Sequence, residues 1–215
     1  MAALAARNLG LRPHDVLVAS TGVIGKHLPM KQIRDNIESV VLSLEGGHTL
    51  AKAITTTDTF PKEIAVSVNL GRGENEITIG GIAKGAGMIH PDMATLLCFL
   101  STDAAISPAF LKKALRSAVD VSFNMITVDG DTSPNDCTII LANGLAGNRI
   151  LKDGSRRAEE FQKALTAVCL FLAKSIARDG EGATKLIQIT VEGARTVSQA
   201  RTSARIVAGS SLVKS

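Results

Sequence analysis

The sequence contains no tryptophan and no tyrosine, and it has only six phenylalanines. Proteins that bind single-stranded nucleic acids usually stack the bases on aromatic side chains, so this shortage weighs against such a partner. Aliphatic residues and alanine must fill the core instead. Because 45% of the residues are hydrophobic, the chain can bury a sizeable core, and global disorder is excluded.

Long runs of basic residues and long apolar runs are also missing. The net charge is +4, from 24 basic and 20 acidic residues, and no run of lysine and arginine concentrates it. This balance argues against a nucleic-acid or membrane-surface partner. No apolar run approaches the roughly 20 residues of a membrane-spanning helix, and the first residues do not resemble a signal peptide. We therefore expect a cytoplasmic protein with no membrane and no nucleic-acid partner.

Metal-binding and disulfide patterns are absent as well. The three cysteines, Cys98, Cys137 and Cys169, are odd in number, lie in apolar stretches and form no CxxC pair. They are therefore expected to be reduced, buried small hydrophobes, and no metal site is predicted. The four histidines share no local spacing with a serine or cysteine nucleophile, so the sequence gives no support for a Ser-His-Asp triad.

Helices and strands are both indicated by the spacing of the apolar residues. Four segments have helical spacing: residues 30–44, 107–119, 158–176 and 194–207. The second opens with Ser107 and Pro108, an N-cap residue followed by proline in the first turn. Six segments favour strands: residues 16–19, 64–68, 77–79, 95–100, 138–142 and 187–191.

The order of these elements predicts the fold class. Helices and strands do not alternate strictly, so we expect an α/β protein of mixed layers. Residues 71–75 are expected to form a hairpin loop, because they separate two segments that favour strands. Residues 144–154 are interpreted as a connection between two lobes.

Two glycine-bearing loops could carry chemistry. Residues 20–25 follow a predicted strand, so their backbone N–H groups could bind an anion or a developing oxyanion, although the residues alone favour a plain strand-to-loop turn. In residues 80–87, four glycines surround Lys84, which suits close approach to a ligand. Neither the Walker spacing nor the dinucleotide fingerprint is present, and a flexible loop remains the alternative.

Thr95 opens an apolar run, an ordinary place for threonine in a buried strand. A sharper hypothesis requires a chain break between Ala94 and Thr95. The freed α-amino group, with a pKa of about 8, could then act as general base for the hydroxyl of the same residue. The spacing of the residues does not indicate that break.

Two acidic loops complete the candidates. Residues 129–136 carry several carboxylates, but Pro134 and Ile140 occupy positions where an EF-hand loop needs glycine and glutamate, so an Asx-rich turn is favoured. Glu181 lies between two glycines in residues 178–185, where it could pair with an ammonium group or belong to a solvated loop.

Five ordered blocks resemble the ornithine acetyltransferase family, also called the bifunctional glutamate N-acetyltransferase. The blocks are LVASTGVIGKHLPM, ITTTDTFPK, GGIAKGAGMIHPDMATLLCFLSTDA, SFNMITVDGDTSPNDC and ARDGEGATKLI. The KGAGMIHPxMAT and DGEGATK patterns are highly specific, and the resemblance spans nearly the whole sequence.

This resemblance implies a self-cleaving acyltransferase of arginine biosynthesis, with mixed layered sheets and helices of the N-terminal-nucleophile-like type. Cleavage would fall between Ala94 and Thr95. Residues 1–94 would form an α chain, and residues 95–215 a β chain with the nucleophile at its N-terminus. The two chains would stay together and assemble into a higher oligomer. Thr95 would take the acetyl group from N-acetylornithine and pass it to glutamate.

The resemblance also assigns supporting roles. Thr21 and Gly22 match the pair that stabilises the oxyanion, by a hydroxyl and a backbone N–H. Lys84 matches a substrate-binding lysine, and its charge near Thr95 would favour the neutral amine. No cofactor or metal is implied, although acetyl-CoA is a second acetyl donor in some members.

The remaining substrate contacts come from two other blocks. Glu181 matches a carboxylate that receives the amino group of the substrate. A threonine of the TTDT stretch also binds substrate, and we choose Thr57 over Thr56.

The sequence departs from the family pattern at Asp92, where asparagine is usual, and at Pro134 in the TSxND stretch. Family members extend beyond both ends of this chain, so we expect negligible transferase activity without flanking segments. A related self-cleaving amidase or aminopeptidase, and a catalytically incompetent fragment, are the alternatives.

Overall fold

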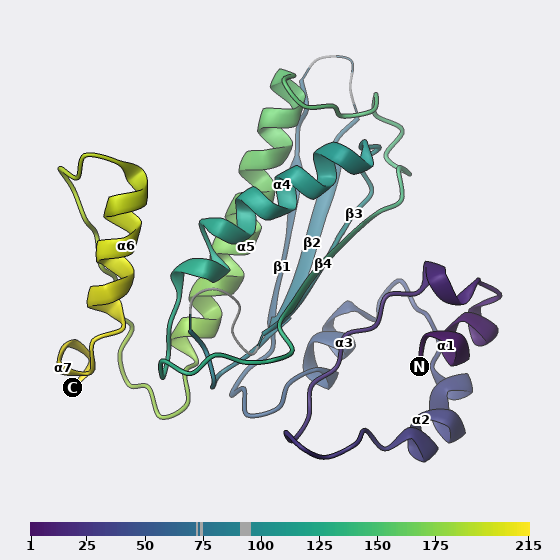
Figure 1. Cartoon of the computed structure of the whole chain (residues 1–215). Helices are drawn as coiled ribbons and strands as arrows, with labels where there is room; N and C mark the ends of the chain where they lie inside the picture. Colours follow the sequence, from purple (N-terminus) through teal and green to yellow (C-terminus); the bar gives the residue numbers. More distant parts are fainter. Residues whose placement is uncertain (72, 74, 91–95) are drawn as a thin grey trace. The chain divides into compact units, whose positions relative to one another are not determined.

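The computed structural model describes residues 1–71, 73, 75–90 and 96–215. The chain divides into two compact units, Met1–Gly47 and His48–Ser215, which are treated separately below (Figure 1). The interpretation of residues 144–154 as a connection between lobes is wrong, because that segment lies inside the second unit. Among the described residues, no helix combines the length and apolarity needed to cross a membrane.

The first unit consists of short helices: α1 (Ala2–Leu9), η1 (Pro13–Asp15), α2 (Met30–Asn36) and η2 (Ile37–Ser39). The helix predicted over residues 30–44 is confirmed only in its first half. The continuation exposes Val41 to 82% and Leu44 fully, so no packing in this unit compensates the low helix propensity of β-branched residues. The strand predicted at residues 16–19 is also wrong, because the described residues 1–47 contain no strand that could pair with it.

The second unit holds one four-stranded sheet of β1 (Lys62–Val68), β2 (Ile77–Lys84), β3 (Leu97–Thr102) and β4 (Cys137–Ala142). The strands lie in that order. β1–β2 and β2–β3 are antiparallel, and β3–β4 is parallel. Four of the six predicted strands are thus confirmed. Residues 187–191 form no strand, since no strand of the described sheet pairs with them.

The helices of this unit are α3 (Gly47–Ala53), which begins at the boundary, α4 (Pro108–Asp120), η3 (Phe123–Met125), α5 (Arg156–Arg178), α6 (Val197–Ala208) and α7 (Ser211–Lys214). Pro108 stands in the first turn of α4 and Ser107 is its N-cap, as predicted. The predicted helices over residues 158–176 and 194–207 correspond to α5 and α6. The mixed α/β class is confirmed.

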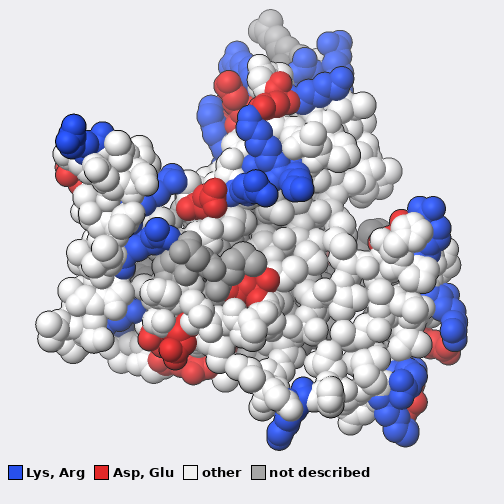
Figure 2. Space-filling model, in the orientation of Figure 1, with Lys and Arg blue, Asp and Glu red and all other residues white. Residues whose placement is uncertain are grey.

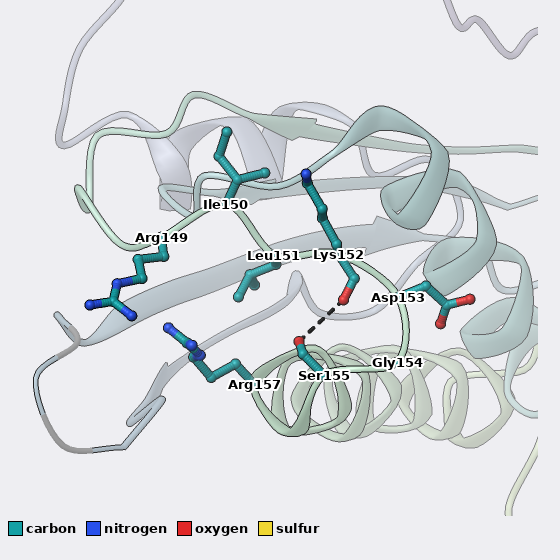
Figure 3. A pocket seen from close by; sticks show the side chains of 8 residues that line it. All are labelled: Arg149, Ile150, Leu151, Lys152, Asp153, Gly154, Ser155 and Arg157. Atoms are coloured by element: carbon teal, nitrogen blue, oxygen red, sulfur yellow. Dashed lines mark hydrogen bonds between the residues drawn. The ribbon is translucent and has the colours of Figure 1, made fainter.

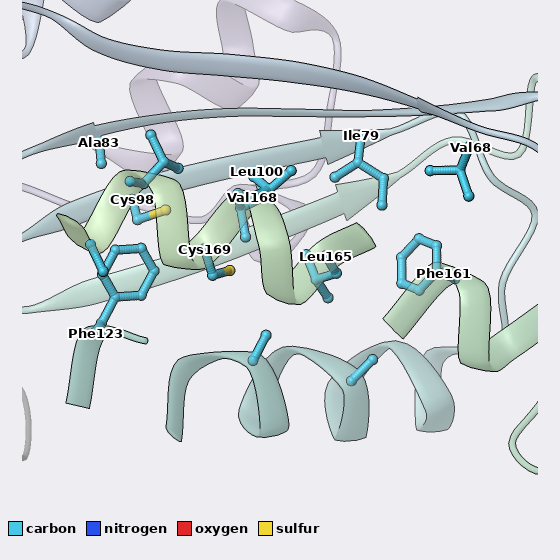
Figure 4. Close-up of a cluster of buried hydrophobic side chains, with 14 of the residues drawn as sticks. Val68, Ile79, Ala83, Cys98, Leu100, Phe123, Phe161, Leu165, Val168 and Cys169 are labelled. Carbon is cyan, nitrogen blue, oxygen red and sulfur yellow. The ribbon is translucent and has the colours of Figure 1, made fainter. Parts of the chain in front are cut away.

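Helix α5 packs on β1 and β2, and α4 packs on α5. Figure 4 shows Val168 of α5 beside Leu100 of the sheet, with Ile79, Leu165 and Cys169 in the same cluster of buried side chains. All five side chains are at most 3% exposed, so this contact is the centre of the core.

Gly81 allows this close packing. A Cβ atom at Gly81 would lie 2.6 Å from Leu100 Cδ2 and 3.0 Å from Leu172 Cδ1. All three cysteines are free, as the sequence predicts. Cys98 and Cys169 are also buried as predicted, whereas Cys137 is only half-buried.

The strand pairing sets up the site. Lys84, the last residue of β2, lies opposite Leu97, the first residue of β3. Leu97 in turn lies opposite Cys137, the first residue of β4. The end of β2 and the beginnings of β3 and β4 therefore meet at one edge of the sheet.

Candidate active site

Lys84 lies at this edge and is only 3% exposed. Burial lowers the pKa of the Lys84 ammonium below its ordinary value, and Lys62 acts in the same direction. The carboxylates of Asp58, Asp136 and Glu181 oppose the shift. A buried amine surrounded by carboxylates is the arrangement in which a protein tunes an ammonium group for chemistry or ligand binding.

A second lysine, Lys62, holds the surrounding segments together. Its Nζ lies 2.6 Å from Asp58 Oδ1 and 2.6 Å from Asp179 Oδ2, and the three side chains are at most 3% exposed. Burial raises the pKa of both carboxyls, but hydrogen bonds to each carboxylate outweigh this effect and leave both pKa values lowered. Both carboxyl groups are therefore ionised at neutral pH.

The two carboxylates anchor the loop that contains Thr57. Asp58 accepts hydrogen bonds from the backbone N–H groups of Thr56, at 3.1 Å, and Gly85, at 2.7 Å. Asp179 accepts from both the N–H and the hydroxyl of Thr59. Thr57 is exposed between these anchors. The TTDT loop is thus fixed to the end of β2 and to the end of α5.

Glu181 lies beside the glycine-rich loop. Its backbone N–H donates to the carbonyl of Ala86 at 2.7 Å. A Cβ atom at Gly87 would lie between 2.6 and 2.8 Å from the carboxyl atoms of Glu181. The structure therefore brings together two residues predicted from separate motifs, Lys84 and Glu181, through the loop over residues 85–87.

The acidic turn over residues 129–136 supports the same region. Asp129 accepts hydrogen bonds from the N–H groups of Met88, at 2.5 Å, and Ile89, at 3.0 Å. Asp136 Oδ1 accepts from the N–H of Leu96 at 2.8 Å. These carboxylates are structural acceptors. Among the described residues, no three His, Cys, Asp or Glu side chains gather in a way that would hold a metal ion.

The other predicted site residues cannot be joined to this cluster. Ala94 and Thr95 lie outside the described residues. Thr21 and Gly22 belong to the first unit, where Thr21 is half-buried and Gly22 is exposed. Thr21 and Gly22 are therefore described apart from the cluster around Lys84.

Sequence reasoning missed Asp58, Lys62, Asp179 and Asp136. A carboxylate four residues before a lysine, as in Asp58 and Lys62, is a weak signal that also fits a solvated loop. The partnership of Lys62 with Asp179 spans 117 residues and leaves no local pattern.

A basic pocket of about 560 Å³ lies elsewhere, at the beginning of α5. Figure 3 shows Arg149, Lys152 and Arg157 at its rim and a hydrogen bond from Ser155 to the Lys152 carbonyl. In Figure 2, lysine and arginine side chains gather around this end of the second unit. The pocket contains none of the predicted site residues, and the whole 23-residue length of α5 separates it from Asp179.

The fold and site define a mixed α/β protein with a buried lysine, opposed by carboxylates, at the edge of its sheet. The ArgJ family model matches residues 1–215. The Arginine biosynthesis bifunctional protein ArgJ of Symbiobacterium thermophilum is 57% identical, over 100% of this chain and 53% of that protein. The protein of the same name from Dehalococcoides mccartyi is 56% identical, over 97% and 51%.

A solved structure is also similar to this chain. The crystal structure of Arginine biosynthesis bifunctional protein argJ from Bacillus halodurans matches with a TM-score of 0.52 at 47% identity, covering 54% of each chain. The chain belongs to the ArgJ family. It spans about half the length of the curated relatives it matches.

Proposed function

We propose that this chain carries the core of an acyltransferase that moves an acetyl group from N-acetylornithine to glutamate through an acetyl-Thr95 intermediate. Membership of a family whose relatives are named arginine biosynthesis bifunctional proteins supports the pathway. The observation that supports the site best is the buried Lys84. It lies opposite Leu97, two residues after Thr95, and is surrounded by carboxylates that include Glu181.

The first step would be self-cleavage. The Thr95 hydroxyl attacks the Ala94 carbonyl carbon and forms an ester as the peptide C–N bond breaks and the nitrogen takes up a proton. Water then hydrolyses the ester and leaves a free amino group and hydroxyl on Thr95. No cofactor or metal is needed for these steps.

Acetyl transfer would follow in two steps. The Thr95 amine takes the hydroxyl proton as the oxygen attacks the acetyl carbonyl, and ornithine leaves with that proton. The amine of glutamate then attacks the acetyl-threonine ester and restores the hydroxyl. Thr21 and Gly22 would donate hydrogen bonds to the oxyanion in both steps. Acetyl-CoA would serve as a second acetyl donor.

The other residues would bind the substrate. The charge of Lys84 close to Thr95 would favour the neutral form of the amine. Glu181, packed over Gly87, is suited to receive the ammonium group of ornithine. Thr57 is held in an exposed position by Asp58 and Asp179 and could donate its hydroxyl to the substrate.

Cleavage at this point would not separate the pieces. Strands β1 and β2 precede Thr95, whereas β3 and β4 follow it, and β2 pairs with β3 along six residue pairs. The processed α and β chains would therefore share one sheet and one core. A cytoplasmic location and assembly into a higher oligomer stay predictions.

Denaturing mass spectrometry of the purified chain tests this proposal. Thr95→Ser should still produce two pieces that begin and end at the predicted bond, because serine keeps the hydroxyl. Thr95→Ala should leave a single mass. Cleavage of the Thr95→Ala chain at the normal rate would remove Thr95 as the nucleophile.

Transfer is measured on the chain joined to the flanking segments of the Symbiobacterium relative. Ornithine release that needs glutamate indicates transfer, whereas release without glutamate indicates an amidase. A hybrid that is cut but releases no ornithine would exclude both activities.

A further inference from the structure

Gly85 and Gly87 lie in the same loop, but only one of them needs glycine for its backbone conformation. Gly85 has a φ of 153°, which residues with a side chain rarely adopt. Gly87 has no positive φ, so its φ angle is open to residues with a side chain. A requirement for glycine at position 87 therefore comes from the space around this residue.

That space is occupied by the carboxylate of Glu181. A Cβ atom at Gly87 would lie 2.6 Å from Glu181 Cδ, 2.7 Å from Oε1 and 2.8 Å from Oε2. Atoms in ordinary van der Waals contact are about 3.5–4.0 Å apart, so Gly87→Ala would force a movement of about 1 Å. The Glu181 carboxylate thus has its place because residue 87 has no side chain.

The backbone of the loop is held on both sides of Gly87. On one side, the N–H of Gly85 donates to Asp58 Oδ1 at 2.7 Å. On the other side, the N–H of Met88 donates to Asp129 Oδ2 at 2.5 Å. A movement of the loop would strain these hydrogen bonds, so the loop is not the part that yields to an added methyl group.

The backbone around Glu181 is held as well. The N–H of Glu181 donates to the carbonyl of Ala86 at 2.7 Å. Gly180 packs so closely on Val128 that a Cβ atom at Gly180 would lie 2.8 Å from Val128 Cγ1. Glu181 itself is exposed, so the end of its side chain can rotate at little cost. An added methyl group at position 87 would therefore displace the Glu181 carboxylate.

Resting on the proposed function, we propose that Gly87 is a positioning residue that sets where the Glu181 carboxylate meets the ammonium group of ornithine. A charge-assisted hydrogen bond between these groups needs a distance of about 2.7–2.9 Å. A displacement of about 1 Å is enough to break it. Gly87 acts through Glu181 and has no side chain with which to bind the substrate.

Steady-state kinetics of the hybrid with flanking segments test this role. Gly87→Ala should lower kcat/KM for N-acetylornithine by at least about tenfold. The loss should appear as a higher KM with little change in kcat, because the ammonium group is bound alike before and during the reaction. Unchanged constants, or a loss in kcat alone, would overturn the role. Rates are compared per cleaved chain.

Gly47→Ala is the matched control for the added methyl group. Gly47 also has no positive φ, and a Cβ atom there would have nothing within 4 Å. Both kinetic constants should stay unchanged in this variant. A loss equal to that of Gly87→Ala would show that the effect does not come from the contact with Glu181, and the positioning role would fall.

A double-mutant cycle shows whether Gly87 acts through Glu181. Glu181→Ala removes the carboxylate that the new methyl group would displace. In that background, Gly87→Ala should change kcat/KM by less than about twofold, because the two sites are coupled through this contact. A tenfold loss in both backgrounds would mean that the methyl group acts by another route, which contradicts the proposal.

Urea denaturation tests the same contact without any chemistry. In the uncleaved Thr95→Ala chain, Gly87→Ala should keep or raise the urea midpoint, since only an exposed side chain yields and alanine restricts the unfolded chain. Gly180→Ala should lower the midpoint, because its Cβ atom would meet the half-buried Val128. An equal loss in the two variants would show that the loop itself shifts, and would overturn the displacement of Glu181.

The outcomes separate this inference from the proposed function. A native hybrid that transfers acetyl groups, with the same KM after Gly87→Ala, would overturn the positioning role alone. A native hybrid that releases no ornithine would overturn the proposed function and, with it, the role of Gly87 toward the substrate. The urea comparison does not depend on either activity.

Discussion

The two ends of helix α5 carry charges of the same kind in opposite surroundings. At its C-terminal end, Lys62 is buried between Asp58 and Asp179, with its side chain 0% exposed. At its N-terminal end, the basic pocket is rimmed by Arg149 and Arg157, and the nearby Lys113–Asp153 ion pair leaves both side chains more than half exposed. Only the first end contains residues predicted to act on substrate.

The two ends differ in the free energy that is needed to keep a charged side chain in its surroundings. An exposed ion pair is screened by water and salt, so it imposes little geometry on the chain. A buried charge must be compensated by partners in good geometry, and it then fixes the segments that supply them. Here those segments are the TTDT loop, the end of β2 and the end of α5, which together surround Lys84. The buried network therefore points to the site better than the open pocket does.

The largest effect should come from removing the buried lysine. Lys62→Met keeps much of the side-chain length but leaves Asp58 and Asp179 as buried carboxylates without their cation. We expect a loss of about 3–5 kcal/mol in the free energy of unfolding. Urea denaturation of the native and variant chains measures it.

Lys113→Met is the matched control at the other end of α5, since it removes one lysine from one ion pair. Because the pair is exposed, we expect no measurable change in stability. Equal losses in the two variants would show that burial does not distinguish the two ends.

The sequence predicted the framework of the second unit better than the first. β1 and β2 alternate apolar and polar residues, and Ser107-Pro108 marks the start of α4, so local patterns were sufficient. Residues 16–19 and 187–191 have strand-like composition, but a strand also needs a partner, which composition cannot reveal. The helix predicted to reach Leu44 failed for a similar reason, because its apolar face has nothing to pack against in its own unit.

The residues of the candidate site also fall into some that the sequence could predict and some that it could not. Lys84 and Glu181 could be selected because they lie in family-specific motifs, and the structure places them around the same glycine-rich loop. Lys62 could not be selected, because its role depends on Asp179, which lies far away in the sequence. Asp136 was taken for part of a simple turn, and only the pairing of β3 with β4 brings it to Leu96.

A smaller effect is expected in the core between the two ends. Gly81→Ala would place a Cβ atom 2.6 Å from Leu100 Cδ2 and 3.0 Å from Leu172 Cδ1 of α5, so these buried side chains must shift. Overpacking of this kind costs about 1–3 kcal/mol. Thermal and urea unfolding should both show the loss.

Gly80→Ala is the control on the opposite face of the same strand. Its Cβ atom would lie 3.5 Å from Ser101 Oγ, an ordinary contact, and alanine restricts the unfolded chain more than glycine. We expect an unchanged or slightly higher stability. A loss at Gly80 equal to that at Gly81 would mean that strand propensity, rather than the approach of α5, explains the glycine.

The smallest effect tests the N-terminal end of α5 itself. Ser155 accepts a hydrogen bond from the N–H of Ala158 at 3.2 Å and donates one to the carbonyl of Lys152 at 3.1 Å. Ser155→Ala removes this cap, and the loss should be about 1 kcal/mol. Ser107 occupies the corresponding position of α4 but makes no side-chain cap hydrogen bond. Ser107→Ala should therefore cost clearly less in the same urea titration. If the two substitutions cost the same, the cap hydrogen bond at Ser155 contributes nothing, and the basic end of α5 is held by packing alone.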